Sequence, residues 1–176
     1  MLDSRQGWLA HPHPIPRPLR IWLSDHGSLT RRLQAGCARF RVQPLRVGIA
    51  RPHPDEVEVL GLRPGMRAYV REVLLLCDDV PVVFAHSVLP CAGLRGGWNG
   101  ITRLGSRSLG EALFNDHRIE RQPLAYKALR RGHPLFDRIA GPHAAAHTLW
   151  ARRSLFCLHR HPLLVTEVFL PAIDAL

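Results

Sequence analysis

Residues 68–90, which read AYVREVLLLCDDVPVVFAHSVLP, decide the fold. Two runs rich in β-branched and aromatic residues, 69–76 and 82–89, flank the turn-forming pentapeptide 77–81. Such runs on either side of a turn predict an antiparallel hairpin. Apolar residues lie on both faces of each run, so we expect these strands to be central in a sheet and covered on both sides.

A second hairpin is predicted near the C-terminus. Its strands are 149–158 and 163–170, joined through the turn 159–162, HRHP. Upstream, apolar residues at nearly two-residue spacing over 40–49 indicate one or two further strands, with a bulge expected at Pro44.

Two short helices are predicted between the strand regions. The first runs over 28–36, with Ser28 or Asp25 as the N-cap and Gly36 as the stop. The second begins at the capping box 108–111, SLGE, which follows a glycine-rich stretch, and runs through Phe114. Strands early, helices in the middle and strands late predict an α+β domain on one mainly antiparallel sheet.

The 176 residues, of which 46% are hydrophobic, suffice for one globular domain and are too few for a TIM barrel of about 250 residues. We expect an extended proline-rich leader at 1–18 and a single domain at 19–176. The sequence contains no run of 18 apolar residues, so no membrane span is predicted. The four cysteines are widely spaced and no signal peptide is recognisable, which predicts reduced thiols in a cytoplasmic protein.

The net charge of +10 comes almost wholly from arginine, and Lys127 is the sole lysine. The paired arginines are separated and no nucleic-acid-binding module surrounds them, so nucleic acid is not an expected partner. A net positive field favours anionic small molecules at a concave site.

Two charged residues interrupt apolar strand faces. Arg71 alternates with Tyr69 and Val73, and Glu167 alternates with Val165 and Phe169 on its own strand. A buried charge without a partner costs several kcal/mol, so each must be paired or bind a ligand. Three interpretations stay open here: the two residues pair as a structural salt bridge, they form a functional pocket that holds an anion and moves a proton, or the strand faces are assigned wrongly.

The other candidate motifs point to no cofactor and no metal. Glu72 lies on the opposite strand face from Arg71. It could also be structural or functional, but the pattern favours a functional role less than for Arg71 and Glu167. His143 and His147 lie four apart, and His159 and His161 form an HxH, but without partners at zinc-site spacing they are interpreted as exposed helix and turn residues. No GxSxG, P-loop or GxGxxG pattern occurs in a suitable context.

At these same residues the sequence resembles the chorismate lyases of bacterial ubiquinone biosynthesis. The resemblance lies in six segments, in order over about residues 20–172: WL at 22–23 with GSLTRRL at 27–33, YVREVLL at 69–75, SVLP at 87–90, SLGEALF at 108–114, LWARRS at 149–154 and PLLVTEVFLP at 162–171.

The resemblance implies a six-stranded antiparallel sheet with helices packed on it and a buried site under mobile flaps. It implies conversion of chorismate to 4-hydroxybenzoate and pyruvate without a cofactor. By the same resemblance Arg71 holds the ring carboxylate, Glu167 meets the phenolic hydroxyl and transfers a proton, and Leu29 and Leu109 form apolar walls.

Two departures accompany the resemblance. His86 stands where family members commonly have an arginine, which puts in question how the enolpyruvyl carboxylate is bound. The stretch 51–67 matches the family poorly.

The alternative function is a non-catalytic domain that binds aromatic acids and is related to the effector domains of GntR-type regulators. Those regulators carry a separate DNA-binding module, which the proline-rich leader of this chain does not resemble. The sequence does not define the oligomeric state, and a monomer is favoured.

Overall fold

The computed structural model describes residues 7–11, 15–139 and 146–176. The strands are β1 (Phe40–Ala50), β2 (Ala68–Cys77), β3 (Val80–Pro90), β4 (Glu120–Arg121), β5 (Ala125–Leu129), β6 (Leu149–Leu158) and β7 (His161–Phe169). The helices are α1 (Arg17–Leu23), α2 (Leu29–Gly36), α3 (Pro54–Val57), α4 (Leu109–Asn115) and α5 (Pro134–Ile139). Short 3-10 helices lie at Cys91–Arg95, Ile101–Arg103 and Pro171–Ala175.

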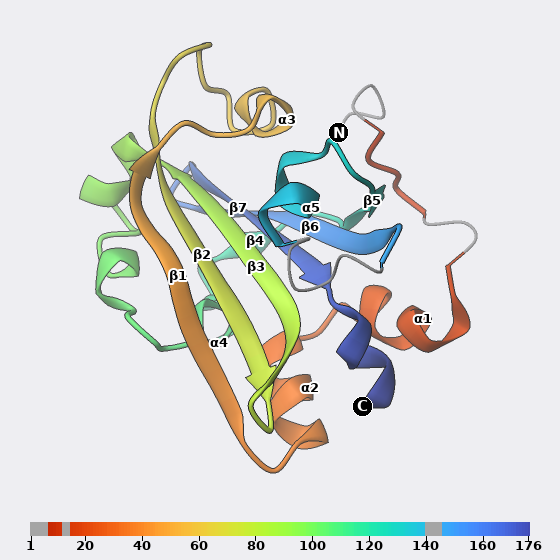
Figure 1. Cartoon of the computed structure of the whole chain (residues 1–176). Coiled ribbons are helices and arrows are strands. Elements are labelled where there is room, and N and C mark those ends of the chain that lie inside the picture. Colours follow the sequence, from red (N-terminus) through yellow and green to blue (C-terminus); the bar gives the residue numbers. More distant parts are fainter. Residues whose placement is uncertain (1–6, 12–14, 140–145) are drawn as a thin grey trace.

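All strands belong to one antiparallel sheet, as Figure 1 shows. Their order is β1-β2-β3-β7-β6-β4, and β5 also pairs with β6. The α+β class on a mainly antiparallel sheet is confirmed, and the described sheet has seven strands where six were expected. The difference arises at one edge, where the two-residue β4 and the five-residue β5 share β6 as their partner.

Both predicted hairpins are present, and both close through shorter turns than the sequence suggested. Asp78 and Asp79 connect β2 to β3, and His159 and Arg160 connect β6 to β7. All four have positive φ, between 48° and 69°, which is the backbone of two-residue type I′ turns. His161 and Pro162, predicted in the turn, therefore belong to β7.

The remaining local predictions agree with the structure at most positions. The segment 40–50 forms one strand, and its register shifts next to Pro44, as expected of a bulge. Ser28 caps α2 through its side chain, and Ser108 caps α4 in the same way. Asp25, the other N-cap candidate for α2, instead forms an ion pair with Arg32 of this helix.

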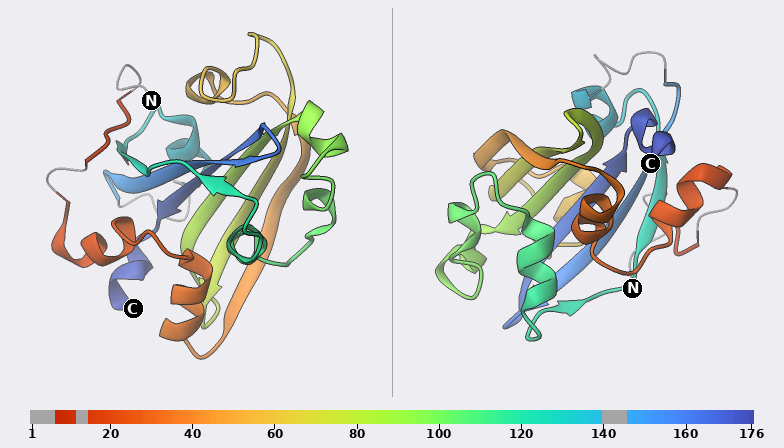
Figure 2. Two further views of the ribbon diagram at one scale, coloured as in Figure 1. Left: turned by 180° about the vertical axis from the view of Figure 1, so that it is seen from behind. Right: turned by 90° about the horizontal axis from the view of Figure 1, so that it is seen from below.

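Different helices cover the two faces of the sheet. Figure 2, in its left-hand view, shows α2 and α4 side by side over one face of β1, β2 and β3. On the other face, Leu135 and Phe136 of α5 pack with Phe84 and Val168, while α3 lies near the end of β1 (Figure 1). The central strands are thus buried on both sides.

Part of the expected leader packs into the domain. Trp8 is 1% exposed and belongs to the core around α5, and Leu9 forms an isolated β-bridge with Tyr126. The helix α1 begins at Arg17, directly after the extended Pro16.

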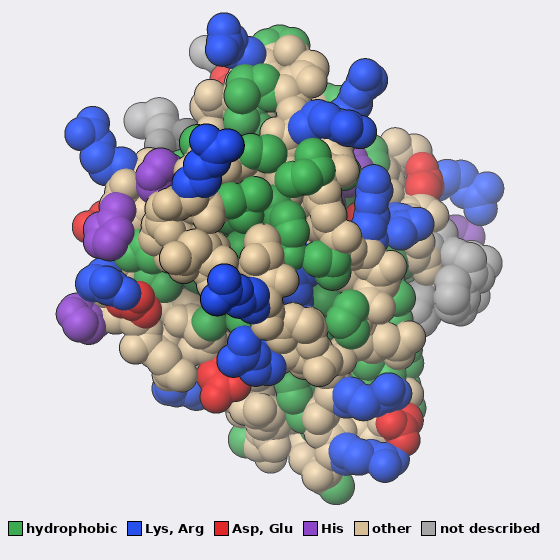
Figure 3. Space-filling model, turned by 90° about the vertical axis from the view of Figure 1, so that its left-hand side faces the viewer, with side chains coloured by type: hydrophobic (Ala, Val, Ile, Leu, Met, Phe, Trp, Pro, Cys, Tyr) green, Lys and Arg blue, Asp and Glu red, His purple; other side chains and the backbone are tan. Residues whose placement is uncertain are grey.

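The surface next to β1 mixes charge with apolar side chains. Leu45, Val47 and Ile49 of β1 are exposed. Figure 3 shows that on this face basic side chains are scattered among hydrophobic ones and do not form a continuous stripe. All four cysteines are free. Among the described residues no helix is long and apolar enough to cross a membrane.

Candidate active site

A buried pocket lies between the sheet and the helices α2 and α4. Its floor is made by residues of β1, β2, β3 and β7, and its roof by residues of the two helices. The residues that line it are Leu29, Thr30, Val42, Arg71, Val73, Leu75, Ala85, Ser87, Ser108, Leu109, Gly110, Leu113, Phe114, Val165 and Glu167. The four site residues expected from the sequence thus line one pocket.

Arg71 is held at one end of this pocket. Its side chain is 3% exposed. Nη2 donates hydrogen bonds to the carbonyl oxygens of Gly105 and Arg107, at 3.0 and 2.9 Å, in the segment that leads into α4. Among the described residues no hydrogen bond uses Nε or Nη1, so these donors remain for an anion. Burial lowers the pKa of Arg71, although a guanidinium stays charged at any physiological pH.

Glu167 has a cationic partner that the sequence analysis did not find. The Nε atom of Arg152, on β6, donates to Glu167 Oε2 at 2.6 Å. Nη1 of the fully buried Arg152 also donates to the carbonyl oxygens of Trp22 and Asp25, at 2.7 and 2.6 Å. A salt bridge between Arg71 and Glu167 was one of the interpretations left open. It does not form in the described structure, because each residue has other partners.

The apolar wall of the pocket depends on a close contact between α2 and α4. Leu29 and Leu109 are the first residues of the two helices, and both are buried. Thr30 and Ser108 join the helices through a hydrogen bond between their hydroxyl oxygens, 2.5 Å apart. A Cβ atom at Gly110 would lie 2.7 Å from Thr30 Oγ1, so the helices approach this closely only because residue 110 is glycine.

A third arginine lies beside the pocket wall. Arg121, on β4, donates from Nε to Ser154 Oγ at 2.9 Å, and from Nη1 to the carbonyl oxygen of His26 at 2.7 Å. Its guanidinium carbon lies 5.3 Å from the ring centroids of both Phe114 and Phe156. Burial lowers its pKa, while the charge of Glu167 acts in the opposite direction.

The other residues considered in the sequence do not face this pocket. Glu72 and His86 are buried on the opposite face of the sheet, where His86 lies 3.3 Å from Glu72. His159 lies in an exposed turn, His147 in an exposed bend and not in a helix, and His143 lies outside the described residues.

The structure is thus an α+β domain with one antiparallel sheet and a pocket roofed by two short helices. Solved structures share this fold. PhnF from Mycobacterium smegmatis aligns with a TM-score of 0.58 at 16% identity, covering 84% of this chain and 65% of that one. A GntR-family transcriptional regulator from Enterococcus faecalis V583 aligns with a TM-score of 0.53 at 14% identity, covering 75% and 90%. At these identities the likeness concerns the fold alone.

Sequence comparison identifies the family. The family model described as chorismate lyase matches residues 8–174, and the chain belongs to this family. A probable chorismate pyruvate-lyase from Thiobacillus denitrificans is 57% identical over 169 residues, which cover 95% of this chain and 90% of that protein. One from Nitrosomonas eutropha is 52% identical and covers 94% and 95%.

The contact between α2 and α4 leads to a prediction about Gly110. Gly110→Ala should lower the free energy of unfolding by about 1–3 kcal/mol, because the added methyl group overpacks the site against Thr30. Thr30→Ala removes the clashing hydroxyl, so the double variant should regain part of that loss. Urea unfolding of the two single variants and the double variant measures this coupling.

The matched control is Gly100→Ala, because a Cβ atom there would meet no atom within 4 Å and φ is −76°. This variant should keep or slightly exceed the parent stability. Additive effects of the Gly110 and Thr30 substitutions would show that the two helices do not constrain each other through this contact.

Proposed function

We propose that this chain is a chorismate lyase that converts chorismate to 4-hydroxybenzoate and pyruvate in the cytoplasm, without a cofactor. The observation that supports the proposal most is the position of Arg71 and Glu167. The two residues line one buried pocket, whose other walls are mostly apolar, in a chain of the chorismate lyase family. An anionic ring compound fits such a pocket, because the arginine neutralises the carboxylate and the apolar walls exclude water.

In this proposal Arg71 binds and orients the ring carboxylate. Nη2 is already fixed by two carbonyl oxygens, so the guanidinium is held in place before a ligand arrives. Both carbonyl oxygens belong to the segment before α4, and the position of that segment therefore affects the substrate directly. Leu29 and Leu109 contact the ring from the helices.

Glu167 is assigned to proton transfer. The ether bond between ring carbon C3 and the enolpyruvyl oxygen breaks while C4 loses its hydrogen as a proton, and the ring becomes aromatic. The enolpyruvyl group leaves with the ether oxygen, takes up one proton and becomes pyruvate, so no oxidant or reductant is needed. Aromatisation provides the driving force, and the enzyme has to position the ring and move protons. Arg152 fixes the carboxyl group of Glu167 by its contact at 2.6 Å.

The second carboxylate of the substrate, on the enolpyruvyl group, requires a further cation. Arg121 is our candidate, because it stacks on Phe114, a residue of the pocket wall, and its charge interacts with that of Glu167. His86 is an unsuitable candidate, since it faces the other side of the sheet.

An assay of chorismate turnover tests the proposed function. Purified protein without added metal or nucleotide should form pyruvate and 4-hydroxybenzoate in equal amounts. The alternative function, an aromatic-acid-binding domain without activity, predicts that 4-hydroxybenzoate binds while chorismate stays unchanged. Folded, product-free protein that binds the acid but forms no pyruvate would therefore reject the lyase and favour that alternative.

The role of Arg71 is tested by substitution. Arg71→Ala should weaken 4-hydroxybenzoate binding by about 2–5 kcal/mol, the range for removing one partner of a buried charge pair. Arg71→Lys should not restore binding, because an ammonium group is a point charge without the planar arrangement of guanidinium donors. Titration calorimetry provides the affinities, and Arg95→Ala, at an exposed position, is the control. Unchanged affinity in Arg71→Ala would assign the residue a purely structural role.

The role of Glu167 requires separating chemistry from product release. Glu167→Gln keeps the size of the side chain but removes the ionisable group, so single-turnover conversion of chorismate should slow by roughly 100-fold or more. Product affinity should change less. Single-turnover measurement is needed because slow release of a buried product would hide a chemical defect in steady-state rates.

Glu120→Gln, an exposed substitution on β4, should leave the single-turnover rate unchanged. Thermal unfolding of the Glu167→Gln variant should be recorded as well, because the substitution weakens the pair with Arg152. Lower stability together with a parental single-turnover rate would limit Glu167 to a structural role and refute proton transfer by this residue.

A further inference from the structure

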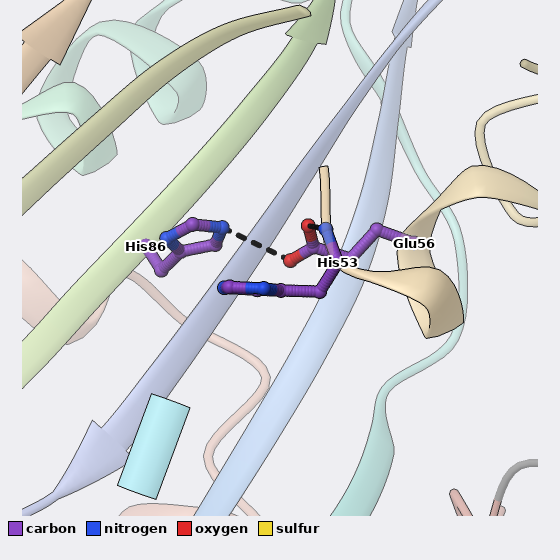
Figure 4. A group of neighbouring side chains, drawn as sticks. All are labelled: His53, Glu56 and His86. Carbon is purple, nitrogen blue, oxygen red and sulfur yellow. Dashed lines mark hydrogen bonds and ion pairs between the residues drawn. The ribbon is translucent and has the colours of Figure 1, made fainter. Parts of the chain in front are cut away.

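A group of buried ionisable side chains lies on the face of the sheet opposite the pocket, where α3 meets β3. His53 precedes α3, Glu56 belongs to it, and His86 lies on β3. Figure 4 shows the carboxylate of Glu56 facing the ring of His86, and the ring of His53 lying beside that of His86. The two rings are stacked, with their centroids 5.1 Å apart. One potential ligand atom from each residue lies within 4.8 Å of the other two. Glu56 is 1% exposed and His86 is 2% exposed.

The atoms at the centre of this group lack hydrogen bonds. Glu56 Oε1 lies 3.0 Å from His86 Nε2, yet neither atom has a hydrogen-bond partner of acceptable geometry among the described residues. A histidine that donates to a carboxylate directs its N–H at the oxygen. Two ligands of one metal ion direct their lone pairs at the ion instead, and in a tetrahedral zinc site they lie about 3.3 Å apart. The two buried atoms lie 3.0 Å apart without a hydrogen bond, so both are available as ligands of a shared ion.

The surrounding contacts place these two atoms at the centre. Glu72 Oε1 lies 3.3 Å from Nδ1, the other ring nitrogen of His86, which also lacks a hydrogen-bond partner of acceptable geometry among the described residues. Arg138 Nε donates to Glu72 Oε2 at 3.0 Å. The second oxygen of Glu56 accepts a hydrogen bond from the backbone N–H of His53 at 2.8 Å. A carboxylate behind a histidine is the usual outer partner of a metal-binding imidazole.

The charges of the group favour a bound cation. The carboxylates of Glu56 and Glu72 both lie against the ring of His86, at 3.0 and 3.3 Å, and a cation between them would balance their negative charge.

From this geometry we infer that His53, Glu56 and His86 form a binding site for zinc or a similar divalent transition metal. Two imidazoles and one carboxylate are a ligand set that zinc accepts, with the fourth position open to water. His53 is only half-buried, so an ion can reach the group from that side. Binding would require the side chain of His53 to move closer to Glu56 and His86 than the observed limit of 4.8 Å. The ion would fasten α3, in the poorly matched stretch 51–67, to β3. No metal was expected from the sequence, in which other histidines, at 143, 147, 159 and 161, stand at ligand-like spacing.

Zinc titration of the tag-free protein, stripped with chelator, tests this inference. The parent should bind one zinc ion per chain and unfold at a higher temperature with zinc than without it. His53→Gln should weaken zinc binding by more than about 100-fold, which exceeds the range of 10 to 100-fold for outer-shell residues. Glu72→Gln should fall within that range. His117→Gln, an exposed histidine on another part of the surface, is the matched control and should bind zinc like the parent.

X-ray absorption at the zinc edge of the parent, loaded with one equivalent, should report two imidazole nitrogens and oxygen ligands without sulfur, whether or not the variants fold. Parental zinc affinity in His53→Gln, or no stoichiometric uptake by the parent, would overturn the inference and leave a proton on His86 as the cation between the two carboxylates. Because the readouts are metal affinity and unfolding temperature, the result is independent of the chorismate assay.

Discussion

The ion pair between Arg152 and Glu167 is the interaction on which the pocket depends. Arg152 has no exposed surface, and its guanidinium binds a side chain of β7 and the carbonyl oxygens of Trp22 and Asp25. One side chain thus fixes the hairpin β6–β7 to the link between α1 and α2. Loss of the Glu167 charge would leave the charge of the buried Arg152 without its ion-pair partner, which costs about 3–5 kcal/mol. The proposed proton-transfer group and the helix that bears Leu29 are therefore held by the same residue.

The alternation of side chains along a strand keeps the two faces of the sheet electrically separate. Arg71 and Glu72 are neighbours on β2, but they point to opposite faces and have different partners. Arg71 donates to carbonyl oxygens of the segment before α4, while Glu72 accepts from Arg138 and lies near His86. Glu72 is thus matched by charges on its own side. The pocket retains the charges of Arg71 and Arg152 against that of Glu167, and this excess suits an anionic ligand.

The sequence predicted the hairpins and the two unusual charges because both are local signals. A run of apolar residues around a turn defines a hairpin, and one charge in such a run is conspicuous. The partner of Glu167 was missed because of the turn length. A four-residue turn at 159–162 pairs Glu167 with Ser154, whereas the observed two-residue turn pairs it with Arg152. In addition, Ala151, Arg152 and Arg153 do not alternate between polar and apolar, although both arginines are buried on opposite faces.

The segment around α3 could not be predicted for a different reason. The helix has four residues, too few for a periodic pattern, and it is held by polar contacts of buried side chains. Asp55 Oδ2 accepts hydrogen bonds from Trp8 and Arg153, and Glu56 meets His86. These partners lie about 30 to 100 residues away in sequence, so no local pattern contains them. His86 is followed in the chain by Ser87, which lines the pocket. Ser87 Oγ donates a hydrogen bond to the carbonyl oxygen of Arg71 on β2. Contacts that fix α3 to β3 therefore also restrain the backbone at Arg71.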